Sequence, residues 1–209
     1  NVLEHLEPKS VFRFFEEMCA IPHGSRNTKA VSDWCADFAR ARGLEYHQDG
    51  DNNIIIIKEA APGYEAAPPV ILQGHLDMVC EQTADCQKDM SREGLDLAVD
   101  GDFVYAKGTT LGGDDGIAVA MALALLDAEG LPHPRLEAVF TVDEEIGLLG
   151  AASIDVTPLK GRQMLNLDSE AEGIFTVSCA GGNTSACLLP LTRAPFDGAG
   201  VTVAVGGLT

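Results

Sequence analysis

Short apolar, strand-like runs alternate with helix-like segments along most of this chain, and this alternation constrains its fold more than any other feature. Strands buried on both faces are apolar throughout, whereas helices repeat their apolar residues every three or four positions. The chain therefore predicts an α/β fold with a mostly parallel central sheet flanked by helices. The predicted strands are 44–47, 54–57, 70–73, 95–99, 103–106, 136–142 and 164–167, and the predicted helices are 10–20, 28–42 and 116–127.

Residues at the predicted helix ends refine these boundaries. Ser10 is expected to cap the first helix, because a serine hydroxyl at that position accepts a backbone N–H, and Pro22 follows the helix end. Gly43 ends the second helix. The third helix is apolar on almost every side, so we expect it to be deeply buried.

The pattern of polar and apolar residues changes after Gly181-Gly182. Polar and apolar residues alternate over 184–191 and again over 201–205, which is typical of strands with one exposed face. We therefore expect one α/β domain over 1–182 and the beginning of a second, β-containing domain over 183–209.

Composition narrows the possible partners. The formal net charge of −18 would repel nucleic acid and anionic membrane surfaces. The sequence has no uninterrupted apolar run of about 20 residues, so we expect no membrane span, and the first ten residues are too polar for a signal peptide. Six cysteines without a Cys-x-x-Cys pair predict reduced, mostly buried thiols in a cytoplasmic protein.

Charged residues cluster where predicted strands end. Charges at the ends of buried strands are costly to desolvate unless an opposite charge compensates them, and a divalent metal ion can compensate several at once. In open α/β sheets, ligands bind at the carboxyl ends of strands. The pattern predicts a catalytic metal site built from His75-Leu76-Asp77, Asp114-Asp115, Glu144-Glu145 and Asp168.

In two of these clusters, the two charged residues are expected to have different roles. His75 and Asp77 are two residues apart at a strand end, so their side chains can lie on the same side and Asp77 can orient the imidazole. Glu144 and Glu145 are adjacent, so their side chains diverge. One of them can bind a metal ion while the other acts as a general base.

Each cluster also has a simpler interpretation. A lone His-x-Asp or Glu-Glu is usually a solvated surface feature. Asp114 and Asp115, within a glycine-rich segment before a helix, can cap that helix, bridge two metal ions or border a phosphate site, although the phosphate-loop lysine is absent. Independent surface residues would not all fall at strand ends, and their joint placement favours the metal site.

Four segments, in this order, resemble the co-catalytic di-zinc peptidases, a family that includes aminoacylases, carboxypeptidases and dipeptidases. The segments are Gln-Gly-His-Leu-Asp-Met-Val, Lys-Gly-Thr-Thr-Leu-Gly-Gly-Asp-Asp-Gly, Thr-Val-Asp-Glu-Glu-Ile-Gly and Leu-Asp-Ser-Glu-Ala-Glu-Gly. A fifth segment, Cys-Ala-Gly-Gly, is similar as well. The resemblance covers essentially the whole chain, and its implied activity is hydrolysis of dipeptides, including those that end in histidine.

The resemblance implies a role for each site residue. Catalysis would use Glu144 as general base and acid, with Asp77 orienting His75. The peptide bond between Asp114 and Asp115 would be cis. Two Zn²⁺ ions would be held in the complete enzyme by His75 and Asp168 on one ion, Glu145 on the other and Asp114 between them.

The resemblance also implies what this sequence lacks. In the family, a further histidine near the end of a chain roughly twice as long binds the second zinc, and no remaining histidine here matches its motif; His23 and His133 are expected to be loop residues. We therefore expect an N-terminal part, with a partial zinc site and little activity alone. The second domain would serve as lid and as interface of a homodimer.

Two alternatives to a dipeptidase remain open at this stage. One is a related amidohydrolase acting on N-acyl amino acids or tripeptides, and the other is a non-catalytic metal-binding module. The presence of both Glu144 and Glu145 favours catalysis, because a binding module needs no general base.

Overall fold

The computed structural model describes residues 1–169, 173–178, 187–192, 194–195 and 197–201. The chain divides into two units, Asn1–Glu172 and Gly173–Thr209. Every helix and strand lies in the first unit, among the residues that the structure describes. The predicted domain boundary at 182/183, residues 184–186 and residues 202–205 lie outside the described residues, and the described part of the predicted strand over 184–191, residues 187–191, is not a strand.

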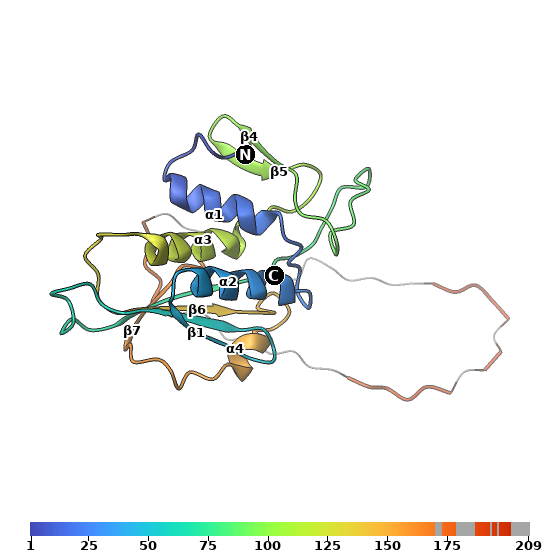
Figure 1. Ribbon diagram of the computed structural model, residues 1–209. Coiled ribbons are helices and arrows are strands. Elements are labelled where there is room, and N and C mark those ends of the chain that lie inside the picture. The colour runs from blue at the N-terminus through green and yellow to red at the C-terminus, as the bar shows by residue number, and fades with distance from the viewer. Residues whose placement is uncertain (170–172, 179–186, 193, 196, 202–209) are drawn as a thin grey trace. The chain divides into compact units, whose positions relative to one another are not determined.

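A five-stranded sheet forms the centre of the first unit (Figure 1). Its order is β1-β2-β6-β3-β7. β2 is antiparallel to both of its neighbours, whereas β6, β3 and β7 are parallel to one another, so every strand but β2 points the same way. The expectation of an α/β fold with a mostly parallel sheet is confirmed. The strands are β1 (Glu45–Gln48), β2 (Ile54–Lys58), β3 (Val70–His75), β6 (Leu136–Thr141) and β7 (Gln163–Asn166).

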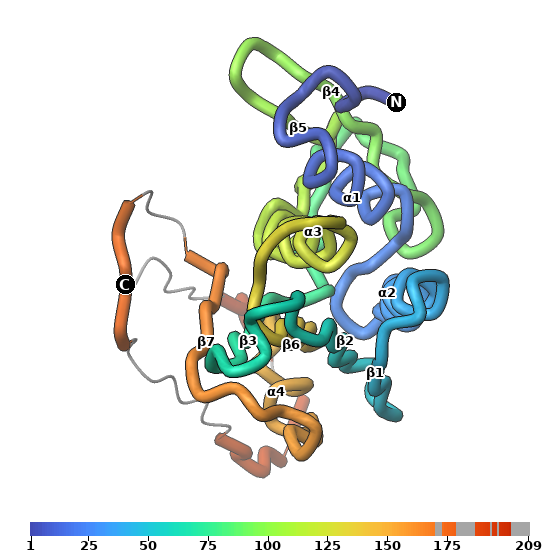
Figure 2. Tube along the Cα trace, turned by 60° about the vertical axis from the view of Figure 1, so that its left-hand side comes forward, coloured from blue at the N-terminus to red at the C-terminus, as the bar shows by residue number. Residues whose placement is uncertain are grey.

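Helices cover both faces of this sheet. Figures 1 and 2 show α2 and α3 on one face, α1 packed on α3 on the same side, and the short α4 on the other face. β2 shows why both faces are covered: Ile54 and Ile56 pack into the large core under the three helices, and Ile55 and Ile57 pack into a small cluster on the opposite face. The helices are α1 (Lys9–Cys19), α2 (Lys29–Ala41), α3 (Gly113–Asp127) and α4 (Leu149–Ser153).

A two-stranded antiparallel hairpin stands apart from the central sheet. It consists of β4 (Leu97–Asp100) and β5 (Phe103–Ala106), with Gly101 in the turn at a φ of 57°. A positive φ is easily adopted only by glycine, so Gly101 suits the turn between the two strands.

The start of α1 corrects the sequence prediction. Ser10 is not the N-cap; the helix begins at Lys9, and Pro8 occupies the capping position without a side-chain hydrogen bond. The Pro8 carbonyl accepts the first helical bond, from the N–H of Phe12, so the extended proline sets the helix start.

Burial of α3 and of the cysteines is also less complete than expected. Met121 and Leu125 of α3 are 43% and 38% exposed, because no described element covers that side of the helix. Of the described cysteines, all of which are free, only Cys19 and Cys35 are buried, so the expectation of mostly buried thiols is wrong.

Across the described part of the chain, no helix is long and apolar enough to cross a membrane.

Candidate metal centre

The parallel strands of the sheet bring the predicted site residues together. β3 ends at His75, which is paired in register with Thr141 at the end of β6. The turn with Glu144 and Glu145 follows β6, and Asp168 follows β7, the neighbour of β3 on its other side. Because these strands run the same way, their carboxyl ends meet at one edge of the sheet.

His75 lies at the centre of the cluster. Its imidazole Nε2 is 3.0 Å from Asp114 Oδ1, 3.9 Å from Glu144 Oε2 and 4.0 Å from Asp168 Oδ2. Two groups of side chains can each offer ligand atoms within 4.8 Å of one another, and both include this histidine. The groups are His75 with Asp114 and Asp168, and His75 with Glu144 and Glu145.

The other contacts of His75 fix the direction of its ring. His75 is only 1% exposed, and its Nδ1 lies 2.9 Å from the main-chain oxygen of Asp77. Its backbone N–H donates to Asp115 Oδ2 at 3.2 Å. This approach needs Gly74, because a Cβ there would lie 2.7 Å from the same carboxylate oxygen. The geometry leaves Nε2 as the nitrogen that faces the carboxylates.

The buried Asp77 carboxylate connects several segments of the site. It accepts the backbone N–H of Glu144 at 3.0 Å and that of Glu145 at 3.4 Å, and the Ser25 hydroxyl at 2.7 Å. Its Oδ1 is 3.4 Å from His75 Nδ1. The sequence indicated the link to His75; it did not reveal those to the Glu144–Glu145 turn or to Ser25, which is 52 residues away in the chain.

Asp114 and Asp115 join the site at the start of α3. Their backbone dihedral angles are not helical, and the peptide bond between them is cis, as the resemblance implied. Asp114 points its carboxylate at His75 Nε2, while Asp115, 2% exposed, binds the backbone of β3. The two aspartates therefore act differently: one faces the centre and the other ties α3 to the sheet.

The electrostatics of the cluster follow from burial and from its many carboxylates. Burial alone lowers the pKa of His75, but hydrogen bonds to Asp77 and Asp114 and the charges of Asp115 and Asp77 outweigh burial and raise this pKa to about 10. Burial, opposed by the charge of His75, raises the pKa of Asp115 to about 7. The centre therefore attracts positive charge strongly.

Burial and neighbouring carboxylates also raise the pKa values of both glutamates. For Glu144, burial is the largest cause, and the charge of Asp168 adds to it. For Glu145, burial is followed by the charge of Asp114. A carboxylate with a raised pKa is a stronger base than a free one.

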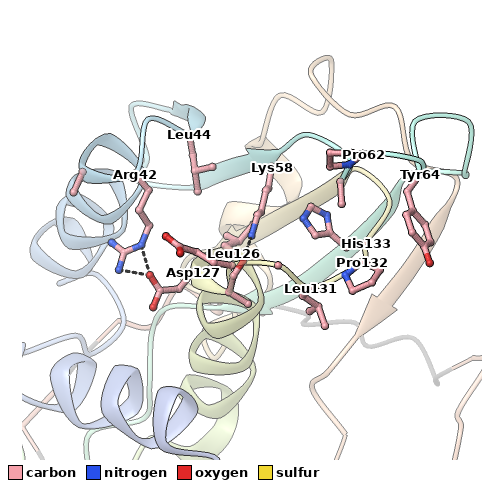
Figure 3. A pocket seen from close by; sticks show the side chains of 15 residues that line it. Arg42, Leu44, Lys58, Pro62, Tyr64, Leu126, Asp127, Leu131, Pro132 and His133 are labelled. Atoms are coloured by element: carbon pink, nitrogen blue, oxygen red, sulfur yellow. Dashed lines mark hydrogen bonds and ion pairs between the residues drawn. The ribbon is translucent and has the colours of Figure 1, made fainter.

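Two cavities help to locate possible ligands. A cavity of about 220 Å³ lies at the predicted site and is lined partly by Asp114, Asp115 and Asp168. A pocket of about 670 Å³ lies at the opposite end of β6, where Lys58 and His133 face it and Arg42 pairs with Asp127 (Figure 3). No predicted site residue lines this second pocket.

The histidines expected to be loop residues lie in loops. His23, 3% exposed, places Nδ1 2.5 Å from the Ile21 carbonyl oxygen. His133, 7% exposed, places Nδ1 2.7 Å from the Pro134 carbonyl oxygen. Neither belongs to a group of described residues that could hold a metal ion.

Comparison with known proteins gives consistent matches. The model of peptidase family M20/M25/M40 matches residues 71–183, more than half of the chain. The cytosol non-specific dipeptidase of Escherichia coli (strain K12) is 38% identical over 180 residues, which are 86% of this chain and 37% of that protein.

Solved structures agree with this match. The aminoacylhistidine dipeptidase of Vibrio alginolyticus is 38% identical with a TM-score of 0.80, covering 83% of this chain and 35% of that one. A tripeptidase from Staphylococcus aureus, at 22% identity and a TM-score of 0.65 over 78% of this chain and 44% of that one, shares the fold.

The chain thus spans little more than a third of the length of the two dipeptidases that it matches. The matched family segment begins in β3 and includes the ends of β3 and β6, the start of α3 and Asp168. On the family match and the 38% identity over 86% of its residues, this chain belongs to peptidase family M20/M25/M40.

Proposed function

We propose that this chain carries a metal-dependent peptidase centre that hydrolyses dipeptides, including those that end in histidine. The observation that carries the proposal is the convergence of His75 with carboxylates in two groups whose ligand atoms lie within 4.8 Å of one another. Two relatives, a cytosol non-specific dipeptidase and an aminoacylhistidine dipeptidase, support this substrate class by their names.

The donor atoms fit zinc. Imidazole nitrogen and carboxylate oxygen are both zinc ligands, whereas calcium and magnesium favour oxygen ligands throughout. Nδ1 of the buried His75 is held by a carbonyl oxygen, the kind of contact that usually orients a metal-binding histidine. We assign His75 and Asp168 to one ion, Glu145 to a second, and Asp114 to both.

Glu144 is the proposed general base. When bound, the ions would polarise the scissile carbonyl and increase the acidity of a nearby water molecule. Glu144 would accept the proton of the attacking water and deliver it to the leaving amine. Its side chain is 28% exposed and lies 3.9 Å from His75 Nε2, so it borders the centre and remains accessible from solvent.

The substitution Glu144→Gln tests this assignment, because it removes the base while preserving size. In the full-length protein, we expect the Glu144→Gln variant to bind zinc within about threefold of the unsubstituted protein. Its rate of dipeptide hydrolysis should fall by about 10²–10⁴. Glu145→Gln is the matched control, and it should weaken zinc binding instead. A Glu144→Gln variant with an unchanged rate would exclude Glu144 as the base.

A substrate panel separates the dipeptidase from its alternatives. Dipeptides, tripeptides and N-acetyl amino acids are offered to the zinc-loaded protein, and we expect dipeptides to be hydrolysed most rapidly. Preference for N-acetyl amino acids would indicate the amidohydrolase, and binding of zinc without any hydrolysis would indicate a metal-binding module.

We also propose a cytoplasmic location and a homodimer for the protein. The word "cytosol" in the name of the Escherichia coli relative supports the location. The dimer rests on the family resemblance alone, and light scattering of the purified protein measures it directly.

A further inference from the structure

The loop between α1 and α2 contacts two separate segments of the metal centre. The Ser25 hydroxyl donates to Asp77 Oδ2 at 2.7 Å. The backbone N–H of the next residue, Arg26, donates to Asp143 Oδ1 at 2.6 Å, immediately before the Glu144–Glu145 turn. Neither loop residue belongs to a group of described side chains that could hold a metal ion, so their contacts are made to the supports of the centre.

The two oxygens of the Asp77 carboxylate have different partners. Oδ1 accepts the N–H of Glu144 at 3.0 Å and lies 3.4 Å from His75 Nδ1. Oδ2 accepts the N–H of Glu145 at 3.4 Å and the Ser25 hydroxyl at 2.7 Å. The serine hydroxyl therefore makes the shortest of these contacts to the carboxylate, and without it Oδ2 would retain only the 3.4 Å contact to the Glu145 N–H. Rotation of the Asp77 carboxylate would therefore change both its contact with His75 and its hydrogen bonds to the Glu144–Glu145 turn.

Ser25 is held in place by its own backbone. Its N–H donates to the Met78 carbonyl at 3.3 Å, and the Met78 N–H donates to the His23 carbonyl at 3.2 Å. Gly24 lets the loop approach this closely, since a Cβ there would lie 2.5 Å from Cys80 Sγ. The hydroxyl thus comes from a segment fixed to the residue that follows Asp77, which makes it a rigid support.

We propose that Ser25 is a positioning residue of the metal centre. It fixes the rotation of the Asp77 carboxylate, and that carboxylate sets both the ring of His75 and the backbone of the Glu144–Glu145 turn. The proposal rests on the proposed function, because it assigns Ser25 to the support of the same zinc site. Ser25 touches neither the ion nor the substrate in this role and acts only through Asp77.

Zinc affinity of the chain, measured by competition with a chromophoric chelator, tests the proposal without any activity assay. We expect Ser25→Ala to weaken zinc binding about three- to tenfold, at or below the lower end of the effect of groups that orient a ligand. Ser25→Thr keeps a hydroxyl and should remain within about twofold of the unsubstituted chain. An affinity of Ser25→Ala within twofold would overturn the proposal.

Ser91→Ala is the matched control. Ser91 makes the same kind of bond, from its hydroxyl to Asp89 at 2.5 Å, on an exposed segment outside the centre. Its loss should leave zinc affinity unchanged. If Ser25→Ala does not fold, as judged by circular dichroism, Ser25→Cys preserves the size with a much weaker donor and carries the same expectation.

A double-mutant cycle shows whether Ser25 acts through Asp77. In an Asp77→Ala background, adding Ser25→Ala should change zinc affinity by less than twofold. An equal loss in both backgrounds would mean a general packing role and would overturn the proposal. If the unsubstituted chain binds zinc and the serine variants do not differ, only this inference is wrong; if the unsubstituted chain binds none, the proposed function is wrong as well.

Discussion

His75 Nδ1 lies 2.9 Å from the main-chain oxygen of Asp77, closer than the 3.4 Å that separates it from the carboxylate of the same residue. A carbonyl oxygen only accepts hydrogen bonds, so Nδ1 carries a proton and Nε2 is the nitrogen that remains for a metal ion. The backbone therefore shares the task of orienting the imidazole, and the carboxylate also holds the amides of Glu144 and Glu145.

Removal of the Asp77 carboxylate should therefore weaken the centre without abolishing it. We expect Asp77→Ala to lower zinc affinity ten- to hundredfold, because the backbone oxygen still holds His75 Nδ1. His75→Ala removes the nitrogen shared by both ligand groups and should abolish binding. Isothermal titration of the two variants decides the point; equal losses would show that the carboxylate alone orients the ring.

Glu137 predicts how the fold responds to acid. It is 0% exposed in β6 and accepts the Arg135 side chain at 2.7 Å and the N–H groups of Lys160 and Gly161 at 2.9 Å. Burial by itself raises the pKa of Glu137, but these donors outweigh it and hold the pKa below the usual 4.5. The stability this gives is present above the unfolded pKa and lost as pH falls through the folded one.

Glu137→Gln should lower the free energy of unfolding by about 2 kcal/mol at pH 7, the worth of hydrogen bonds to a charged group. The difference from the unsubstituted chain should shrink at an acidic pH below the lowered pKa of folded Glu137, where this carboxylate itself becomes protonated. Urea unfolding at the two pH values measures both effects. The control is Glu59→Gln, which removes a 70% exposed carboxylate from the same arginine and should cost less than about 1 kcal/mol.

The two sides of α3 should respond differently to truncation. Leu123 is 0% exposed and Leu125 is 38% exposed, so the same substitution can be compared at two positions of one helix. Leu123→Ala should lower the free energy of unfolding by about 2–5 kcal/mol, since it leaves a cavity in the core. Leu125→Ala should cost less than about 1.5 kcal/mol, and equal losses at the two positions would contradict the observed burial.

Much of the fold could be predicted because burial on both sheet faces leaves a clear signature. The run Ile54–Ile57 is apolar without interruption, and the structure places its alternate side chains in two different clusters. The helix limits were less predictable. A serine near a helix start suggests a cap, but Pro8 and not Ser10 occupies the capping position. The helix therefore begins at Lys9, one residue before the predicted start of the range 10–20.

The gathering of the site residues was also predictable, because parallel strands deliver their carboxyl ends to one edge. His75 ends β3, and Glu144 and Asp168 follow the neighbouring parallel strands β6 and β7; the structure brings their carboxylates within 4.0 Å of the His75 Nε2 atom. Their individual roles at the metal remain predictions. The contribution of Ser25 carried no signal in the sequence, because a lone serine in a loop has no charge or spacing that indicates its partner.

Exposure of the apolar side of α3 could not be predicted from periodicity. Met121 and Leu125 are as apolar as their buried neighbours, and only the tertiary arrangement decides which side of a helix is covered. The same holds for Met164 and Leu165 of β7. These residues are 59% and 50% exposed, although apolar residues in a strand usually indicate burial.

Zinc content of the purified chain, measured by elemental analysis after loading and dialysis, tests the metal centre most directly. We predict about one zinc ion per chain, lost in both His75→Ala and Asp114→Ala, because these residues contribute the closest pair of ligand atoms at 3.0 Å. No retained zinc, or the same zinc content in the unsubstituted chain and in the two variants, would contradict the assignment of a metal centre to these residues.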